Sequence, residues 1–170
     1  MNSRTSTLEV RAARACESDA IAELNNFFAD QHLMLRRSPE ITSMAVDDYL
    51  VAVDGHGRIL GCGSLKEYSP SVAEVAAIAV SPAAQGLGLG RRIVAAVEAL
   101  ARKRGIPEVF ALTLEPQFFE ALGYVRIDRA RYPEKIRRDC IGCARRFACN
   151  ETCFAKPLRD LADEQFEVAA

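Results

Sequence analysis

The residue types best suited to chemistry gather in one stretch, residues 74–92. Its second half, Gln85-Gly86-Leu87-Gly88-Leu89-Gly90, is rich in glycine and leads into a helix predicted over residues 87–104. Glycine allows sharp turns and leaves backbone N–H groups uncovered. The start of a helix attracts anions through its free N–H groups and its dipole. The stretch is therefore predicted to form an anion site that suits phosphate.

Two nucleotide-binding motifs do not fit this loop. A P-loop requires Lys-Ser or Lys-Thr after its last glycine, where this chain has Arg91-Arg92. A dinucleotide-binding fold requires Gly-x-Gly-x-x-Gly near the start of the chain, and residues 86–90 have a different spacing. The ordinary alternative is a glycine-rich turn that caps a helix.

The stretch instead fits Gln/Arg-x-x-Gly-x-Gly/Ala after an apolar strand, and on this motif the chain resembles the GNAT acetyltransferases. The resemblance implies an α+β (mixed αβα) acyl-CoA N-acyltransferase fold, with a central, mostly antiparallel sheet and helices on both faces. It also implies acetyl-CoA as co-substrate. The residues it assigns to acetyl-CoA binding are Ile78, Val80, Gln85, Gly86, Leu87, Gly88, Leu89, Gly90 and Arg91.

Glu74 opens the apolar strand that leads into the loop. Acetyl transfer from a thioester to an amine requires a group that removes a proton from the amine. A carboxylate beside an apolar strand is partly desolvated, which raises its pKa. The resemblance implies that Glu74 is the catalytic general base, and a structural or solvated carboxylate is the alternative. Phe118 and Phe119 occupy the positions where many members carry a tyrosine acid, so solvent is expected to protonate the thiolate.

Three further elements look like the acetyltransferase domain of bacterial N-acetylglutamate synthases. They are Leu35-Arg36-Arg37-Ser38, residues 112–119 and Tyr132-Pro133-Glu134-Lys135, in a resemblance that spans roughly residues 8–140. It implies direct acetylation of the α-amine of L-glutamate in a ternary complex, the entry step of arginine biosynthesis, by a short stand-alone form without the kinase domain. Because arginine recognises carboxylates with a planar fork, Arg36 and Arg37 suit a dicarboxylate. The predicted substrate-binding residues are Arg36, Arg37, Lys135, Phe118 and Phe119.

Two other functions stay open at this point. One is acetylation of a different amine, such as another amino acid, a polyamine or a protein N-terminus. Arg36 and Arg37 argue against a polyamine, because a polyamine site is expected to be acidic. The other is a non-catalytic acetyl-CoA-sensing or metal-binding regulator.

Four cysteines near the C-terminus form a separate pattern, C-x2-C-x5-C-x3-C. They are Cys140, Cys143, Cys149 and Cys153. Four thiols so close together could form a compact all-cysteine zinc site, although the gap between the two pairs is short for a standard zinc ribbon. Disulfide or redox pairing and a loose thiol-bearing tail are the alternatives. Cys16 and Cys62 are expected to be small buried apolar residues.

The elements that must position these residues follow from hydrophobic periodicity. Strands are predicted over residues 8–11, 49–53, 59–66, 74–80, 108–112 and 124–127. Helices are predicted over residues 19–29, 39–44, 87–104 and 116–122, the first two with Ser18 and Ser38 as N-caps. Residues 1–138 are expected to form the acetyltransferase domain. Residues 139–170 are expected to form a Cys-rich segment with an acidic tail over residues 160–167.

Composition limits the choice of partners and location. A net charge of −1 gives no overall field for nucleic acid or membrane, although residues 126–146 carry eight Lys or Arg and predict a local basic face. Neither a membrane span nor a signal-peptide core is apparent, so we expect a cytoplasmic protein. The predicted partner is a small amino-acid substrate; the oligomeric state stays open, with a homodimer as one expectation.

Overall fold

The computed structural model of the chain describes residues 8–158, which form two units. Unit 1 comprises residues 8–65 and 75–99, and unit 2 comprises residues 66–74 and 100–158. Strands β3 (Ile59–Ser69) and β4 (Val72–Val80) and helix α3 (Leu89–Lys103) each contribute residues to both units. The predicted acidic tail over residues 160–167 lies outside the described residues.

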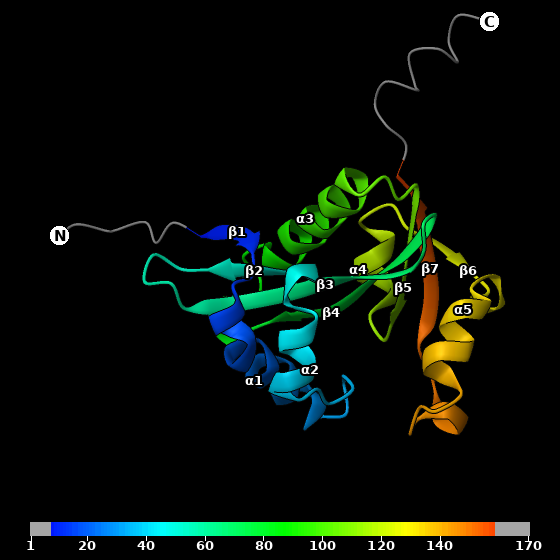
Figure 1. Ribbon diagram of the computed structural model, residues 1–170, viewed down its shortest axis with the longest axis horizontal. Helices are drawn as coiled ribbons and strands as arrows, with labels where there is room; N and C mark the ends of the chain where they lie inside the picture. Colours follow the sequence, from blue (N-terminus) through cyan, green and yellow to red (C-terminus); the bar gives the residue numbers. More distant parts are fainter. Residues whose placement is uncertain (1–7, 159–170) are drawn as a thin grey trace, which may run out of the picture. The chain divides into compact units, whose positions relative to one another are not determined.

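Unit 1 contains β1 (Glu9–Ala12), α1 (Ser18–Ala29), α2 (Pro39–Met44) and β2 (Tyr49–Val53), together with parts of β3, β4 and α3. In Figure 1, α1 and α2 lie on one face of these strands and α3 lies on the other. The alternation along β2 explains this layering. Tyr49, Val51 and Val53 pack with Ile21 of α1 in one core cluster, so residues 50 and 52 turn to the opposite face.

The predicted strands over residues 49–53 and 59–66 correspond to β2 and β3, which form a hairpin. The two strands pair antiparallel from Tyr49 opposite Ser64, with a register shift between Ala52 and Val53. The turn between them is fixed by Asp54, whose Oδ1 accepts hydrogen bonds from the backbone N–H groups of His56 (2.9 Å) and Arg58 (3.0 Å). This is the local side-chain bonding that makes aspartate a turn residue.

Glycines in β3 let α3 approach the strand closely. A Cβ atom at Gly63 would lie 2.5 Å from Cδ1 of Ile78 and 2.6 Å from Cγ2 of Ile93. One at Gly61 would lie 2.7 Å from Cδ1 of Ile93. Ile93 of α3 therefore occupies the space that strand side chains would fill.

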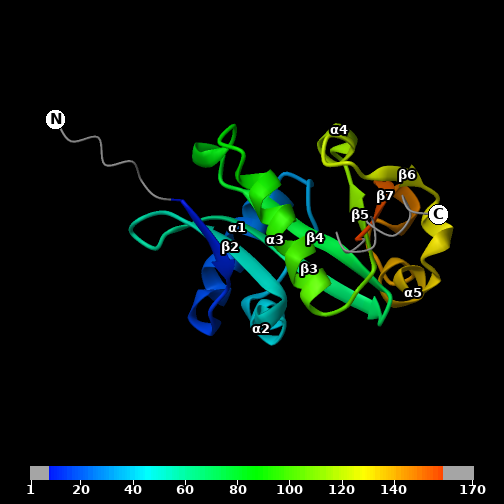
Figure 2. The same ribbon diagram turned by 90° about the horizontal axis from the view of Figure 1, so that it is seen from above.

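Unit 2 contains β5 (Glu108–Thr113), α4 (Pro116–Glu120), β6 (Val125–Ile127), α5 (Pro133–Lys135) and β7 (Thr152–Pro157). The start of β4 pairs parallel with β5, and β7 pairs antiparallel with both β5 and β6. Figure 2 shows α4 and α5 on opposite sides of β5 and β7. On the α5 side, the ring of Phe110 stacks on that of Tyr132 with centroids 4.0 Å apart.

The strand order β1-β2-β3-β4-β5-β7-β6 and the helices confirm the predicted α+β fold class. Ser38 caps α2 as predicted, since its side chain accepts from the N–H of Ile41. The Ser18 prediction is wrong: α1 begins at Ser18, whose hydroxyl donates to the carbonyl of Ala15. Strand β7 was not predicted. Among the described helices, none has the length and apolar character that a membrane span requires.

We expect Gly63→Ala to destabilise the protein by about 1–3 kcal/mol, because the new methyl group overlaps side chains of β4 and α3. Gly142→Ala is the matched control, since a Cβ there meets no atom within 4 Å. Urea unfolding of both variants measures the difference. Equal midpoints for the two variants would contradict the close packing described for Gly63.

Candidate active site

Glu74 lies on the part of β4 that pairs with β5, and only 5% of it is exposed. Its Oε2 atom accepts two hydrogen bonds, one from the hydroxyl of Tyr68 (2.9 Å) and one from Nζ of Lys135 (2.8 Å). Tyr68 belongs to β3 and Lys135 ends α5. The structure thus brings together two residues that the sequence assigned separately, the base candidate and a substrate-binding candidate.

Asp139 completes the arrangement, which we call the Glu74 cluster: Lys66, Tyr68, Glu74, Lys135 and Asp139. Its Oδ2 atom accepts from Nζ of Lys66 (2.7 Å), from Nζ of Lys135 (3.0 Å) and from the Tyr68 hydroxyl. Asp139 lies in the π-helical turn Ile136–Cys140 that follows α5, so it shares a helix face with Lys135 four residues earlier. Two ammonium groups therefore face two carboxylates around one hydroxyl.

The electrostatics of the cluster keep Asp139 and Lys135 charged. Burial raises the pKa of Asp139, but hydrogen bonds from Lys66, Tyr68 and Lys135 outweigh it and hold that pKa below its usual range. Burial likewise lowers the pKa of Lys135, but Glu74 and Asp139 raise it further. The pKa of Tyr68 is raised by burial and by both carboxylates. Its hydroxyl consequently stays a proton donor at neutral pH.

The ring of Tyr68 also contacts cations. Nζ of Lys66 lies 5.5 Å and Nζ of Lys135 lies 5.7 Å from its centroid, and the guanidinium of Arg138 lies 4.8 Å away. These distances are within the range of cation–π attraction. The face of the Tyr68 ring therefore stabilises the cations by cation–π contact, and the Tyr68 hydroxyl hydrogen-bonds to the two carboxylates.

A single left-handed residue interrupts β4 within unit 1. Ala77 has φ 52°, which is costly for a residue with a Cβ and is typical of a bulge. Side chains of β3 bond to the carbonyls at this point: Ser64 Oγ donates to Ala76 (3.3 Å) and Cys62 Sγ contacts Ala77 (3.6 Å). The bulge alters the direction of the backbone groups just before Ile78, where the resemblance places donor-binding main-chain groups.

The glycine loop joins β4 to α3 in unit 1. Gly86 and Gly88 have φ of +79° and +73°, conformations that favour glycine, and a Cβ at either position would meet no atom within 4 Å. The side chain of Gln85 donates to the carbonyl of Val80 (3.2 Å). Leu89 begins α3 and is buried, so it anchors the helix start under the exposed loop. This exposed, glycine-shaped backbone fits the pyrophosphate of a coenzyme A group.

Arg37 lies in unit 1, on a segment that α1 holds by its main chain. The Asn26 side chain accepts from the N–H of Arg37 (2.9 Å) and donates to its carbonyl (2.7 Å), and Asn25 donates to the carbonyl of Leu35 (2.9 Å). The Arg37 side chain is half-buried and donates to the hydroxyl of Tyr49 (3.4 Å). We call Asn25 and Asn26 the asparagine clamp.

The other substrate-binding candidates have different surroundings. Arg36 is exposed and pairs with Asp30. Phe119 is buried and packs edge-on against Tyr124, which is also buried. Phe118 is half-buried beside Phe119. Arg36 and Arg37 lie in unit 1, whereas Phe118, Phe119 and Lys135 lie in unit 2.

The zinc prediction for Cys140, Cys143, Cys149 and Cys153 is not supported. Among residues 8–158, no group of three or more His, Cys, Asp or Glu side chains is arranged to hold a metal ion. Cys153 is buried in β7, and burial raises the pKa of its thiol to about 11. The sulfur of Cys149 accepts instead from Arg129 (3.3 Å), and that of Cys143 accepts from the N–H of Arg145 (3.4 Å). The thiols therefore serve separate contacts.

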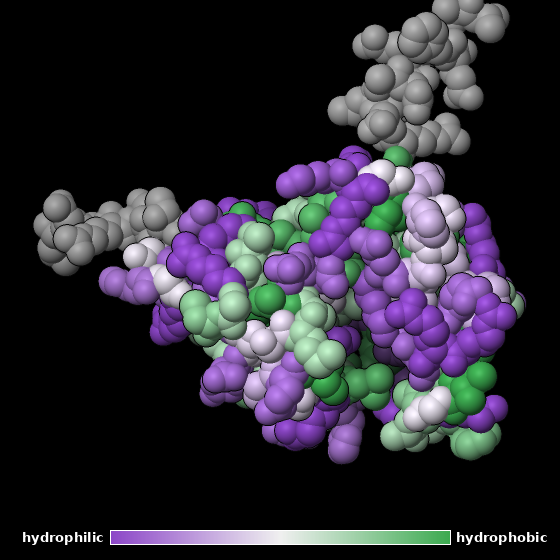
Figure 3. All heavy atoms as spheres, in the orientation of Figure 1, coloured by the Kyte–Doolittle hydropathy of each residue, from purple (hydrophilic) through white to green (hydrophobic). Residues whose placement is uncertain are grey.

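The cysteines that the structure describes are all free thiols. Cys62 is fully buried as expected, and Cys16 is exposed, contrary to expectation. Figure 3 shows hydrophilic side chains over α5, in line with the predicted basic face, and an apolar area over the segment that follows it. Ile141 and Phe147 are the large exposed apolar residues of that segment.

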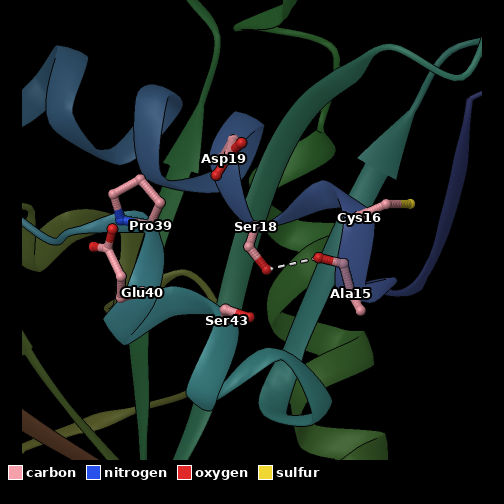
Figure 4. Close-up of a pocket in the computed structure, with 7 residues that line it drawn as sticks. All are labelled: Ala15, Cys16, Ser18, Asp19, Pro39, Glu40 and Ser43. Carbon is pink, nitrogen blue, oxygen red and sulfur yellow. Dashed lines mark hydrogen bonds between the residues drawn. The ribbon is translucent and has the colours of Figure 1, made fainter.

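A surface pocket of about 420 Å³ lies in unit 1 between the starts of α1 and α2. Figure 4 shows its lining, in which the Ser18 hydroxyl donates to the carbonyl of Ala15 (3.0 Å). Asp19 and Glu40 also line it. No predicted site residue takes part in this lining, so the pocket is separate from the Glu74 cluster.

Sequence reasoning missed Lys66, Tyr68 and Asp139. Two signals were present: the alternation of Lys66 and Tyr68 along one strand, and the i, i+4 spacing of Lys135 and Asp139. Neither signal indicates which carboxylate the cations face. That information comes from the pairing of β4 with β5, whose partner residues are 36 positions apart in the sequence, Val72 opposite Glu108 and Glu74 opposite Phe110.

Comparisons with known proteins agree with this architecture. A model of the acetyltransferase (GNAT) family matches residues 15–125. An uncharacterised N-acetyltransferase of Chlorobaculum tepidum is 37% identical over 149 residues, 88% of this chain and 96% of that protein. The amino-acid acetyltransferase of Mycobacterium tuberculosis is 33% identical over 121 residues, 70% of this chain and 69% of that protein.

A solved structure is also similar. It is N-acetylglutamate synthase from Neisseria gonorrhoeae, complexed with coenzyme A and N-acetyl-glutamate, with a TM-score of 0.81 and 26% sequence identity. The match covers 92% of this chain but 36% of that one, so this chain spans about a third of the synthase.

We expect Asp139→Asn to be less stable than the wild type at pH 7, with a difference that shrinks as the pH falls below about 4. The folded-state pKa of Asp139 is depressed, so its stabilising contribution is present above the unfolded pKa and is lost as the pH falls towards the folded value. Urea unfolding at pH 7, 5, 4 and 3 measures this. Asp30→Asn, which removes an exposed pair, is the control; a difference independent of pH would count against the cluster.

Proposed function

Because the chain belongs to the acetyltransferase (GNAT) family and is an acetyl-CoA-dependent N-acetyltransferase, we propose that it acetylates the α-amine of L-glutamate. The observation that carries the proposal is the buried carboxylate of Glu74. Its Oε2 atom is held by Tyr68 and Lys135, while Oε1 accepts no hydrogen bond from the residues that the structure describes. A carboxylate fixed at one oxygen and free at the other is suited to accept a proton.

In this proposal Glu74 Oε1 takes one proton from the substrate ammonium group. The amine nitrogen attacks the thioester carbonyl carbon, the carbon–sulfur bond breaks, and the leaving thiolate is protonated from solvent while the nitrogen loses its second proton. The N–H near Ile78 would stabilise the oxyanion, because the bulge at Ala77 sets the direction of the strand there. Tyr68 would orient Glu74 rather than act as an acid, since its raised pKa keeps the proton on the hydroxyl.

The donor would be held by the residues assigned from the sequence. Ile78 and Val80 would present main-chain groups to the pantetheine arm. The loop would bind the pyrophosphate through the backbone of residues 85–90, with Arg91 adding charge. The positive φ of Gly86 and Gly88, and the free space beside them, support this role, because side chains at these positions would be strained and would cover the N–H groups.

Glutamate is proposed as the acceptor for two reasons. The M. tuberculosis relative is an amino-acid acetyltransferase, and the similar solved structure is a synthase bound to N-acetyl-glutamate. Arg37 and Lys135 also carry the cationic groups that carboxylates require, and Arg36, Phe118 and Phe119 remain predicted contacts. The role in arginine biosynthesis, the cytoplasmic location, the homodimer and the domain boundary at residue 138 stay predictions.

The experiment that tests the acceptor is turnover with acetyl-CoA and a panel of amines, followed by release of free thiol. We expect glutamate to react with a kcat/KM at least tenfold above those of glutamine, aspartate, a polyamine and a peptide N-terminus. Faster reaction of any other amine would reassign the acceptor. Absence of turnover with every amine, despite coenzyme A binding, would refute the proposal.

We expect Glu74→Gln to lower kcat by about 100- to 10,000-fold while the affinity for coenzyme A is retained, because the amide cannot accept the proton. The pH dependence of kcat should also lose the limb that reports the carboxylate. Glu67→Gln is the control, since Glu67 is a half-exposed neighbour that pairs with Arg104. If the pH–rate profile of Glu74→Gln matches that of the wild type, Glu74 is not the base.

A further inference from the structure

Lys135 has one hydrogen-bond donor more than the cluster uses. An ammonium group carries three N–H donors, and within the described residues Lys135 donates to Glu74 Oε2 (2.8 Å) and Asp139 Oδ2 (3.0 Å). Its side chain is 15% exposed and is therefore in partial contact with solvent. Glu74 is in a similar position, with Oε2 occupied and Oε1 available.

The Glu74–Lys135 ion pair therefore has one unused N–H donor on its cation and one unused acceptor, Oε1, on its anion. The two charged atoms lie 2.8 Å apart. An α-amino acid at neutral pH has the complementary arrangement, because its ammonium and carboxylate groups are attached to the same carbon. A plain amine complements only half of the pair, and a simple carboxylate only the other half.

We propose that the Glu74–Lys135 pair is the receptor for the zwitterionic end of an α-amino acid. Glu74 Oε1 receives the ammonium group that will be acetylated, and the third N–H of Lys135 receives the α-carboxylate. This assigns Lys135 to the α-carboxylate and not to the side-chain carboxylate of the acceptor. The assignment rests on the proposed function and deepens it, since it makes the α-carboxylate a requirement for productive binding.

The test uses two glutamate analogues that each replace one carboxylate by a neutral amide. Isoglutamine lacks the α-carboxylate and glutamine lacks the side-chain carboxylate. Their kcat/KM values, or their inhibition constants against glutamate, are compared in the wild type, Lys135→Met, Lys135→Arg and Lys66→Met. This forms a double-mutant cycle between a residue and a substrate group. Lys66→Met is the matched control, because Lys66 contacts Asp139 and the Tyr68 ring but is not bonded to Glu74.

In the wild type we expect isoglutamine to be about 10- to 100-fold poorer than glutamate, the usual effect of a charge-assisted hydrogen bond. In Lys135→Met this penalty should fall to within about twofold of unity, while the penalty for glutamine persists. Lys135→Arg and Lys66→Met should both retain the isoglutamine penalty. Melting curves show whether each variant is folded, and the Arg variant gives a result even if the Met variant does not fold.

Three outcomes would overturn the proposal. The first is that Lys135→Met keeps the isoglutamine penalty. The second is that Lys135→Met loses the glutamine penalty instead, which would assign Lys135 to the side-chain carboxylate. The third is that Lys135→Arg loses the isoglutamine penalty although it retains the charge. These outcomes differ from failure of the proposed function, which is seen first, as an absence of glutamate turnover in the wild type.

Discussion

Buried charge is the constraint on which unit 2 depends. Glu74 and Lys135 are removed from water, and an isolated ion in such a place costs several kcal/mol. The cluster avoids this cost by balancing two carboxylates with two ammonium groups. Removal of one partner from a buried pair typically costs about 3–5 kcal/mol, so each member constrains the others. Strands β3 and β4 and the turn after α5 must all be present for any of these charges to be tolerated.

The position of Lys135 follows from an aromatic anchor three residues earlier. Tyr132 stacks on Phe110 of β5, and its hydroxyl donates to Glu108 (2.9 Å) at the start of the same strand. Pro133 then begins α5, where its fixed φ suits the first helical position. Lys135 is therefore the last residue of a short helix whose start is anchored on β5, the strand that pairs with Glu74. In the element Tyr132-Pro133-Glu134-Lys135, Tyr132 thus anchors the segment on β5, Pro133 starts the helix and Lys135 supplies the charge.

Local patterns in the sequence were sufficient for most of the fold. The strand over residues 49–53, the helix over residues 87–104 and the Ser38 N-cap each have a short-range cause, and each was predicted. Strand β7 was missed because its six residues lie in a Cys-rich segment, and its burial is decided by β5 and β6. The contact between Glu74 and Lys135 was missed because it spans 61 positions. The zinc prediction is not supported, because the sulfurs of Cys143 and Cys149 make separate contacts that cysteine spacing does not specify.

The asparagine clamp fixes the backbone of residues 35–37 without using the side chains of that segment. Asn25 and Asn26 bond to main-chain atoms of residues 35 and 37, which every amino acid supplies in nearly the same form. Side chains along this segment can therefore change during evolution while the backbone keeps its course. Substitution of an exposed side chain such as Leu35 therefore changes the surface of this segment and leaves the hydrogen bonds that hold its backbone.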